Sequence, residues 1–170
     1  MTEFAAAVDA FLDALFALDP ILATGVGHHV RDGEWPDLSA AGRDRRLAFV
    51  DEWSSTFAGL DDATLTRDEQ VDRDLLLAEL ESQRFGDTEL REECWSPLWW
   101  VYLLGEGFFG LLSRDFAPLP ERLGAIASRA EGLPTVLGAA RDVLVGIEGR
   151  PIDRLHADKA LEQWPGLISI

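Results

Sequence analysis

Three histidines, His28, His29 and His156, are the residues of this chain best suited to metal or general-base chemistry. A zinc-hydrolase helix carries the pattern His-Glu-x-x-His, in which two zinc ligands lie one turn apart with a general base between them. The sequence has no such pattern. His28 and His29 are adjacent, so on a helix their side chains diverge by about 100° and do not readily share one ion. We expect one of them to pack against its loop and the other to be solvated.

The other common catalytic motifs are absent as well. There is no phosphate loop and no Gly-x-Ser-x-Gly nucleophile motif, and Gly25-Val26-Gly27 lacks the third glycine of a dinucleotide-binding turn. Cys94 follows Glu92 and Glu93, whose negative charges raise the pKa of a nearby thiol and disfavour a nucleophile. We therefore assign no catalytic, cofactor-binding or metal-binding residue to this chain, and its motifs do not decide whether it is an enzyme.

Glu106 is the carboxylate with the most unusual surroundings. It is the only charged residue between Cys94 and Leu112. Burial among apolar residues would raise its pKa unless a cation such as Arg114 paired with it. We expect a structural ion pair rather than a catalytic acid.

The same segment is rich in aromatic residues. They could line a groove for a hydrophobic or peptide ligand, but large aromatic side chains more often fill a core or an interface. We favour the core or interface interpretation for these residues, which are Trp95, Trp99, Trp100, Tyr102, Phe108 and Phe109.

The elements that carry these residues are predicted to be helices. Apolar residues recur at spacings of three and four, and no segment alternates as a half-buried strand does. Thr2 is predicted to cap a first helix that ends before Pro20, and Ser39 to cap a second. Thr66 and Glu69 form a capping box for a third helix.

Glycine and proline divide the remaining segments. Residues 20–38 are expected to form one helical turn and a loop, Pro118 to open a helix, Pro134 to start another, and Asp153 to begin the last. We predict an all-α fold of about six helices in an irregular bundle, one domain over residues 1–170. The residues expected to be buried are Leu47, Val50, Trp53 and Phe57 of the second helix and Leu123, Ile126 and Ala127 of the helix after Pro118. The apolar pattern of the third helix runs through Val71, Leu75, Leu76 and Leu80, and that of the last helix through Leu155, Leu161 and Trp164.

The composition restricts the partners. The 170 residues include 31 acidic and 15 basic side chains, a formal net charge of −16. This charge disfavours nucleic acid and anionic membranes, both of which are bound by basic surfaces. The single cysteine cannot form an internal disulfide, and the first residues lack the basic stretch of a secretion signal. We expect a cytoplasmic protein without nucleic-acid or membrane partners.

Residues 164–170 form an apolar run, although chain termini are usually polar. This pattern favours an N-terminal fragment of a longer protein. The alternative is a native C-terminus that packs into the core.

Several segments, taken in order, resemble the N-terminal region of a bacterial family named domain of unknown function 885 (DUF885). Residues 20–29 carry the pattern Pro-x-x-Ala-Thr-x-x-Gly-x-His after the first helix. The other resembling segments are residues 71–76, 95–102, 120–123 and 133–134.

That family is similar to all-helical zinc peptidases of the carboxypeptidase and oligopeptidase kind, whose His-Glu-x-x-His motif lies downstream of the region resembled here. The resemblance implies that this chain is the N-terminal domain of a larger helical metallopeptidase-like fold, inactive alone. Zinc and a peptide substrate are implied for the full-length protein only. The expected partner is the rest of the parent chain, or a second copy bound through exposed apolar surface.

Two other functions remain open from the residues. One is a free-standing helical interaction module, whose acidic face binds a basic partner and whose tryptophan segment binds an apolar one. The other is a small metal-dependent enzyme that uses His28, His29 and His156.

Overall fold

The computed structural model describes residues 2–169, which contain α-helices, short 3₁₀ and π turns and no β-strand. The all-α prediction is confirmed. This part of the chain has seven α-helices rather than about six: α1 (Glu3–Leu18), α2 (Pro20–Val26), α3 (Ala40–Ala58), α4 (Arg67–Phe85), α5 (Pro97–Leu112), α6 (Leu119–Val143) and α7 (Arg154–Ile168).

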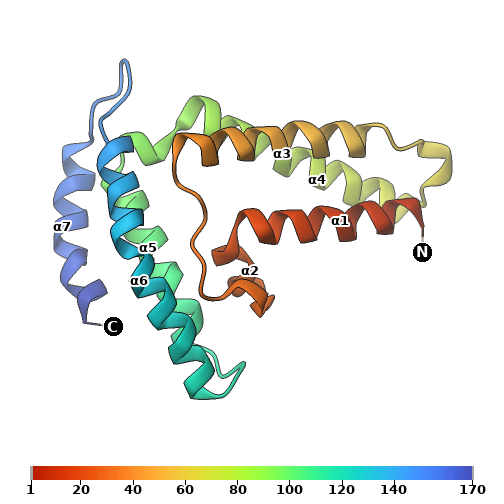
Figure 1. The fold of residues 1–170 in the computed structure, drawn as a ribbon. Helices are drawn as coiled ribbons and strands as arrows, with labels where there is room; N and C mark the ends of the chain where they lie inside the picture. The colour runs from red at the N-terminus through yellow and green to blue at the C-terminus, as the bar shows by residue number, and fades with distance from the viewer. Residues whose placement is uncertain (1, 170) are drawn as a thin grey trace.

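Helices α1, α3 and α4 lie side by side and form a long arm (Figure 1). An aromatic core holds them together. The Phe11 ring lies 5.4 Å from Phe49, 5.5 Å from Trp53 and 5.5 Å from Phe57 between ring centroids. Each such pair adds about 0.5–1.5 kcal/mol beyond the burial of its area.

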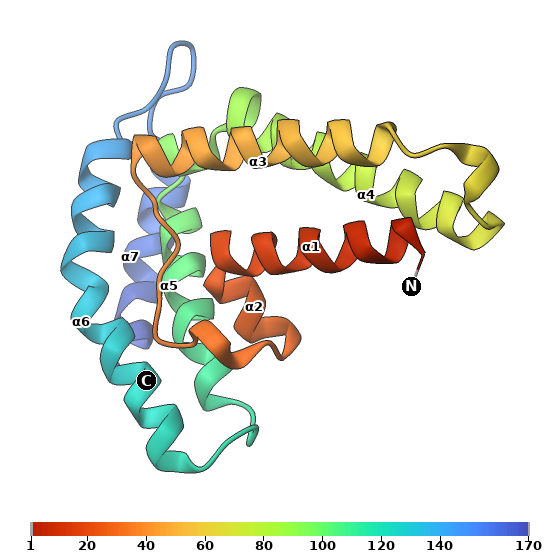
Figure 2. The ribbon, with the colours of Figure 1, turned by 45° about the vertical axis from the view of Figure 1, so that its right-hand side comes forward.

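Helices α5, α6 and α7 form a second group that runs across the direction of the arm (Figure 2). Its core contains Trp100 and Leu104 of α5 and Val136 of α6. Within the described residues, no helix is both long and apolar enough to cross a membrane.

Helix α2 connects the two groups, since it contacts both α1 and α5. The prediction of a single turn here is wrong, because α2 has seven residues. Asp19 starts the helix by accepting the N–H groups of Ile21 (3.1 Å) and Leu22 (3.0 Å), and Pro20 occupies the first turn, where no N–H is needed. Gly27 ends the helix with a φ of 93°, which glycine adopts without strain.

The predicted break at Pro134 is also wrong, since α6 continues through it. Proline removes the hydrogen bond to the carbonyl four residues earlier, which here belongs to Ala130. Pro134 and Ala130 are both exposed, so water can satisfy that carbonyl. The cost of the proline is therefore reduced, and the packing of α6 on α5 sustains the helix.

Several predicted apolar stripes are not buried. Helix α7 packs mainly on α5, and a helix with one neighbour buries only a narrow strip. The prediction that Leu123 and Ala127 of α6 are buried is wrong, since both are exposed. The other exposed residues of the apolar patterns are Val71 and Leu75 of α4 and Leu155, Leu161 and Trp164 of α7. Of the stripe predicted for α3, Val50, Trp53 and Phe57 are buried and Leu47 is half-buried.

Candidate functional site

Arg129 of α6 is a fully buried charged side chain where α6 meets α2 and α5. Its guanidinium donates to the hydroxyl of Thr24 (2.8 Å), to the carbonyl of Pro20 (3.4 Å) and to the carbonyl of Gly107. The Nε–H is buried without a partner among the described residues. The side chain therefore joins three helices at one point.

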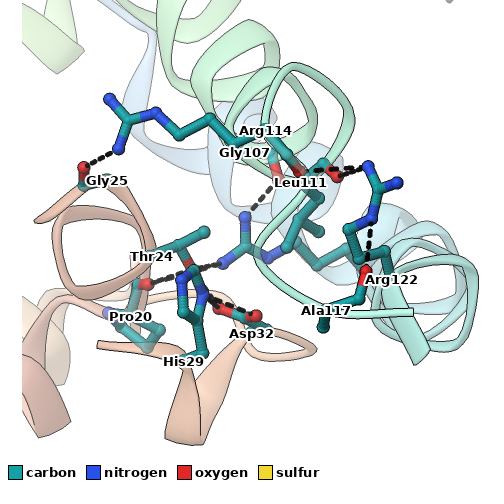
Figure 3. A network of polar contacts seen from close by, with 11 residues as sticks. Pro20, Thr24, Gly25, His29, Asp32, Gly107, Leu111, Arg114, Ala117 and Arg122 are labelled. Carbon is teal, nitrogen blue, oxygen red and sulfur yellow. Dashed lines mark hydrogen bonds and ion pairs between the residues drawn. The ribbon is translucent and has the colours of Figure 1, made fainter. Parts of the chain in front are cut away.

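The family-like pattern at residues 20–29 supplies Pro20, Thr24 and His29 to this network (Figure 3). Thr24 accepts from Arg129 and donates to Asp32 Oδ1 (2.7 Å). The other oxygen of Asp32 lies 3.0 Å from His29 Nδ1, and the His29 ring stacks on Phe116 with centroids 3.6 Å apart. The pattern thus builds a polar network around a buried cation.

The electrostatics of Arg129 follow from its position. Burial lowers the pKa of Arg129 below its ordinary value, while Asp32 and Asp19 act in the opposite direction. An arginine keeps its proton in proteins, so the group remains a cation. The face of Trp35 lies 5.9 Å from the guanidinium carbon, and Trp35 donates its indole N–H to the Arg129 carbonyl (2.8 Å).

The three histidines occupy separate environments. The His28 ring stacks on Phe16 with centroids 4.7 Å apart, whereas His29 belongs to the Arg129 network. His156 of α7 contacts Ser96 through Nδ1 (2.9 Å) and stacks on Trp95. In residues 2–169, no group of three or more His, Cys, Asp or Glu side chains is arranged to hold a metal ion. The part of the chain that the structure describes therefore offers no arrangement that fits zinc, and it gives the three-histidine site no support.

The expectation for Glu106 is wrong. Its side chain is exposed, because α5 presents this position to solvent beside α7. Arg114 does not pair with it and instead donates to the carbonyl of Gly25 (2.9 Å). For Cys94 the expected direction is confirmed: burial raises the pKa of the thiol, Glu93 raises it further, and Arg91 opposes both.

The aromatic segment divides between core and surface. Trp100 is buried and the Trp99 ring packs edge-on against it, 4.9 Å away. In contrast, Tyr102 and Phe109 are 57% and 65% exposed. They line an apolar groove between α5 and α7, together with Val101 and Leu167. Both the core and the groove interpretations therefore apply, to different residues.

A cavity of about 470 Å³ lies between α1, α4 and α5. Apolar side chains contribute to its lining, among them Phe11, Leu15, Leu80 and Leu103. Carboxylates also line it, and these are Asp19, Glu79, Asp87, Glu92 and Glu93. Arg46 pairs with Asp87 at 2.9 Å. This lining suits a ligand with apolar and cationic groups, such as a peptide segment, and it contains no histidine or cysteine within the described chain.

Comparison with family models places residues 20–170 in the family described as bacterial protein of unknown function (DUF885). The chain belongs to the DUF885 family. The resemblance to DUF885 that the segments at residues 20–29 and 71–76 predict is therefore confirmed.

One solved structure is similar to this DUF885 chain over its whole length. It is described as "a putative lipoprotein of unknown function" from Shewanella oneidensis. The two share 30% sequence identity with a TM-score of 0.86, and the match covers 100% of this chain and 30% of the other. This chain therefore spans about a third of its relative. A comparison with curated proteins finds no match.

The buried arginine was not predicted from the sequence of this DUF885 member. Arg122, Arg129 and Val136 are seven residues apart, so they share one face of α6, and all three are buried. Arg122 fills its position by donating to the carbonyls of Ala117 (3.1 Å) and Arg114 (3.1 Å). The seven-residue spacing is the signal that could have identified both arginines.

Proposed function

We propose that this chain is the N-terminal helical domain of a longer zinc-peptidase-like protein and is inactive alone. The observation that carries the proposal is its coverage of the Shewanella protein, in which the equivalent of this whole chain makes up 30% of one longer chain. The order of the family-like segments supports the same assignment. The remaining part of the parent would supply the catalytic residues.

The cavity between α1, α4 and α5 gives this domain a role in the proposed parent protein. Its leucines and carboxylates would form part of the wall of a channel for peptides. The Arg129 network would keep α2, α5 and α6 in register beside that wall. Zinc would be bound by residues outside this chain, where it would polarise the scissile carbonyl.

The test compares the 170-residue chain with the longest product of its gene. Both are purified from cells grown with zinc, and zinc content and peptide hydrolysis are measured with and without a chelator. We expect stoichiometric zinc and chelator-sensitive hydrolysis only in the longer product. Zinc binding and hydrolysis by the 170-residue chain, or a stop codon directly after Ile170, would refute the proposal.

A second function, a free-standing acidic interaction module, is favoured by the net charge of −16. Such a module would be monomeric and would bind no hydrophobic dye, because its exposed apolar residues would be scattered. Light scattering and dye fluorescence distinguish the two. Dye binding or concentration-dependent dimerisation supports a surface that the rest of the parent covers.

For the compartment, we propose the cytoplasm, on the ground of the single cysteine, which cannot form an internal disulfide. The description of the relative as a lipoprotein supports an envelope location instead. Fractionation of the source bacterium with an antibody to this domain decides between them.

A further inference from the structure

A second cavity, of about 220 Å³, shares the lining residues Leu38, Arg46 and Glu93 with the large one. The start of α3, the turn at residues 91–94 and the segment after α6 enclose it. Three of its lining residues are arginines, although arginine and lysine are outnumbered two to one by acids in the chain. These are Arg43, Arg46 and Arg91.

Two of these arginines have no acidic partner in the structure. Within residues 2–169, Arg43 and Arg91 form no ion pair, and the Nε–H of each is buried without a hydrogen-bond partner. The single side-chain bond of Arg91 in this part of the chain goes to a weak acceptor, the sulfur of Cys94 (3.3 Å). Arg46 differs, because it is held by Asp87. Two arginines without an acidic partner therefore line the same small cavity, and most of their side-chain donors have no partner among the described residues.

The cavity also contains two carboxylates, Glu93 and Asp142. Neither lies within 4 Å of an arginine, lysine or histidine nitrogen among the described residues, and Glu93 accepts only a weak bond from the Cys94 thiol (3.6 Å). The arginines are thus not neutralised by direct contact with these acids. They are arranged to receive oxygen atoms from another source.

Backbone features beside the same cavity also favour the binding of an anion. Ser39 caps α3 by accepting from Gly42 (3.2 Å), so the positive end of a 19-residue helix adjoins the cavity. Arg91 has a φ of 44° and is the single non-glycine residue with a positive φ among residues 2–169. It follows a π-helical turn, Gly86–Leu90, which its own N–H closes by donating to Gly86 (2.8 Å). Such strain is characteristic of ligand-binding positions.

We propose that this cavity, which we name the arginine pocket and define by Ser39, Arg43, Arg46 and Arg91, binds a small oxyanion. The ligand is a carboxylate or a phosphate, whose oxygens accept from the forked donors of Arg43 and Arg91. The site is independent of the proposed peptidase activity, since it requires only residues of this chain.

The experiment titrates the 170-residue chain with inorganic phosphate, with acetate, and with glycylglycine or its C-terminal amide, at constant ionic strength set with chloride. Calorimetry measures Kd. Saturable binding of at least one anion is expected. Binding of glycylglycine but not of its amide identifies a peptide carboxylate as the source, and preference for phosphate identifies a free phosphate group. The absence of saturable binding of all three oxyanion probes, phosphate, acetate and glycylglycine, would overturn the proposal.

Variants distinguish specific binding in the arginine pocket from nonspecific attraction of anions to any arginine of the chain. Arg43→Gln is expected to raise Kd at least tenfold, whereas Arg154→Gln, whose side chain is 95% exposed on α7, leaves it unchanged. Arg91→Gly is the sharper test, because it removes a guanidinium and also relieves the positive φ. We expect this variant to melt at the same or a higher temperature and to bind the anion at least tenfold more weakly. Unchanged affinity in folded Arg43→Gln and Arg91→Gly, or equal loss in Arg154→Gln, contradicts the pocket.

Discussion

The guanidinium of Arg129 is held mainly by neutral acceptors. No carboxylate oxygen of residues 2–169 lies within 4 Å of it, and its hydrogen bonds go to two carbonyls and to the Thr24 hydroxyl. Asp32 acts one step away, through Thr24. Hydrogen bonds to a charged group contribute about 1.5–3 kcal/mol each, and losing such a donor leaves buried acceptors unpaired. The network therefore stabilises the junction of α2, α5 and α6.

Replacement of this arginine tests its contribution at the residue scale. Arg129→Met keeps much of the side-chain volume but leaves the Thr24 hydroxyl and the Gly107 carbonyl without their donor. We expect the free energy of unfolding to fall by about 3 kcal/mol. Urea denaturation followed by circular dichroism measures it. Arg141→Met, at an exposed position of the same helix, should change it by less than about 0.5 kcal/mol; equal effects would show that Arg129 has no special role.

What could be predicted for single residues depended on the range of the interaction. The effect of Glu93 on Cys94 acts between neighbours, and it was predicted correctly in direction. Thr24 and Arg129 are 105 residues apart, and the local sequence around either residue does not predict that it contacts the other. The prediction of a buried ion pair at Glu106 was wrong for a similar reason. Whether α5 buries or exposes that position depends on where α7 packs.

At the scale of elements, the start of α4 couples stability to pH. The N–H of Thr66 and the hydroxyls of Thr2 and Thr66 donate to Glu69, and these bonds hold the pKa of Glu69 below its ordinary value. A carboxylate with a lowered pKa in the folded state stabilises the fold above its unfolded-state pKa. That contribution is lost as the pH falls through the folded-state value.

The variant Glu69→Gln should therefore melt at a lower temperature than the parent at pH 7, and the difference should shrink as the pH falls below about 4. Thermal melts followed by circular dichroism at several pH values give this profile. Glu79→Gln, on the exposed side of the same helix, serves as the control and should show no such convergence. A difference that stays constant down to pH 2 would contradict the capping interpretation.

Close packing around Trp35 provides a second test on helices. A Cβ added at Gly107 of α5 would collide with the Trp35 ring, whereas one added at Gly138 of α6 would meet no atom within 4 Å. Alanine favours a helix over glycine by about 1 kcal/mol. We expect Gly138→Ala to stabilise the protein by about 0.5–1 kcal/mol and Gly107→Ala to destabilise it by about 2 kcal/mol. Chemical denaturation of both variants checks this, and a stabilised Gly107→Ala would refute the packing.

Helix beginnings were predictable because their signals are local. Thr2, Ser39, Thr66 and Asp153 each accept an N–H three residues ahead, and all four helices begin where the sequence predicts. The continuation of α6 through Pro134 was not predictable from the local sequence. There, packing against α5 outweighs a residue that breaks isolated helices.

At the scale of the whole molecule, the two helix groups differ in what they leave uncovered. The groove between α5 and α7 exposes Tyr102 and Phe109, which lie close together on α5. Exposed apolar patches of this kind mark interaction surfaces. In the proposed parent protein, this groove would be covered by helices outside the present chain.

Replacement of both residues by serine tests that role. Tyr102→Ser with Phe109→Ser should abolish most dye binding and any concentration-dependent dimerisation of the 170-residue chain, while the melting temperature stays nearly constant because both side chains are exposed. Dye fluorescence and sedimentation measure the two effects. Leu75→Ser, on the distant arm, is the matched control. Retained dimerisation in the double variant would exclude this groove as the interface.

The position of Arg129 along the chain has a consequence for biosynthesis. Its acceptors at Pro20 and Thr24 precede it by 109 and 105 residues. At bacterial translation speeds of about 5–20 residues per second, α2 is synthesised roughly 5–20 s before its cation is made. Throughout that interval the Thr24 hydroxyl has only its local partners, the Pro20 carbonyl and Asp32, and not the guanidinium. The arm can fold while the ribosome is still translating, but the junction closes only after most of the chain has emerged.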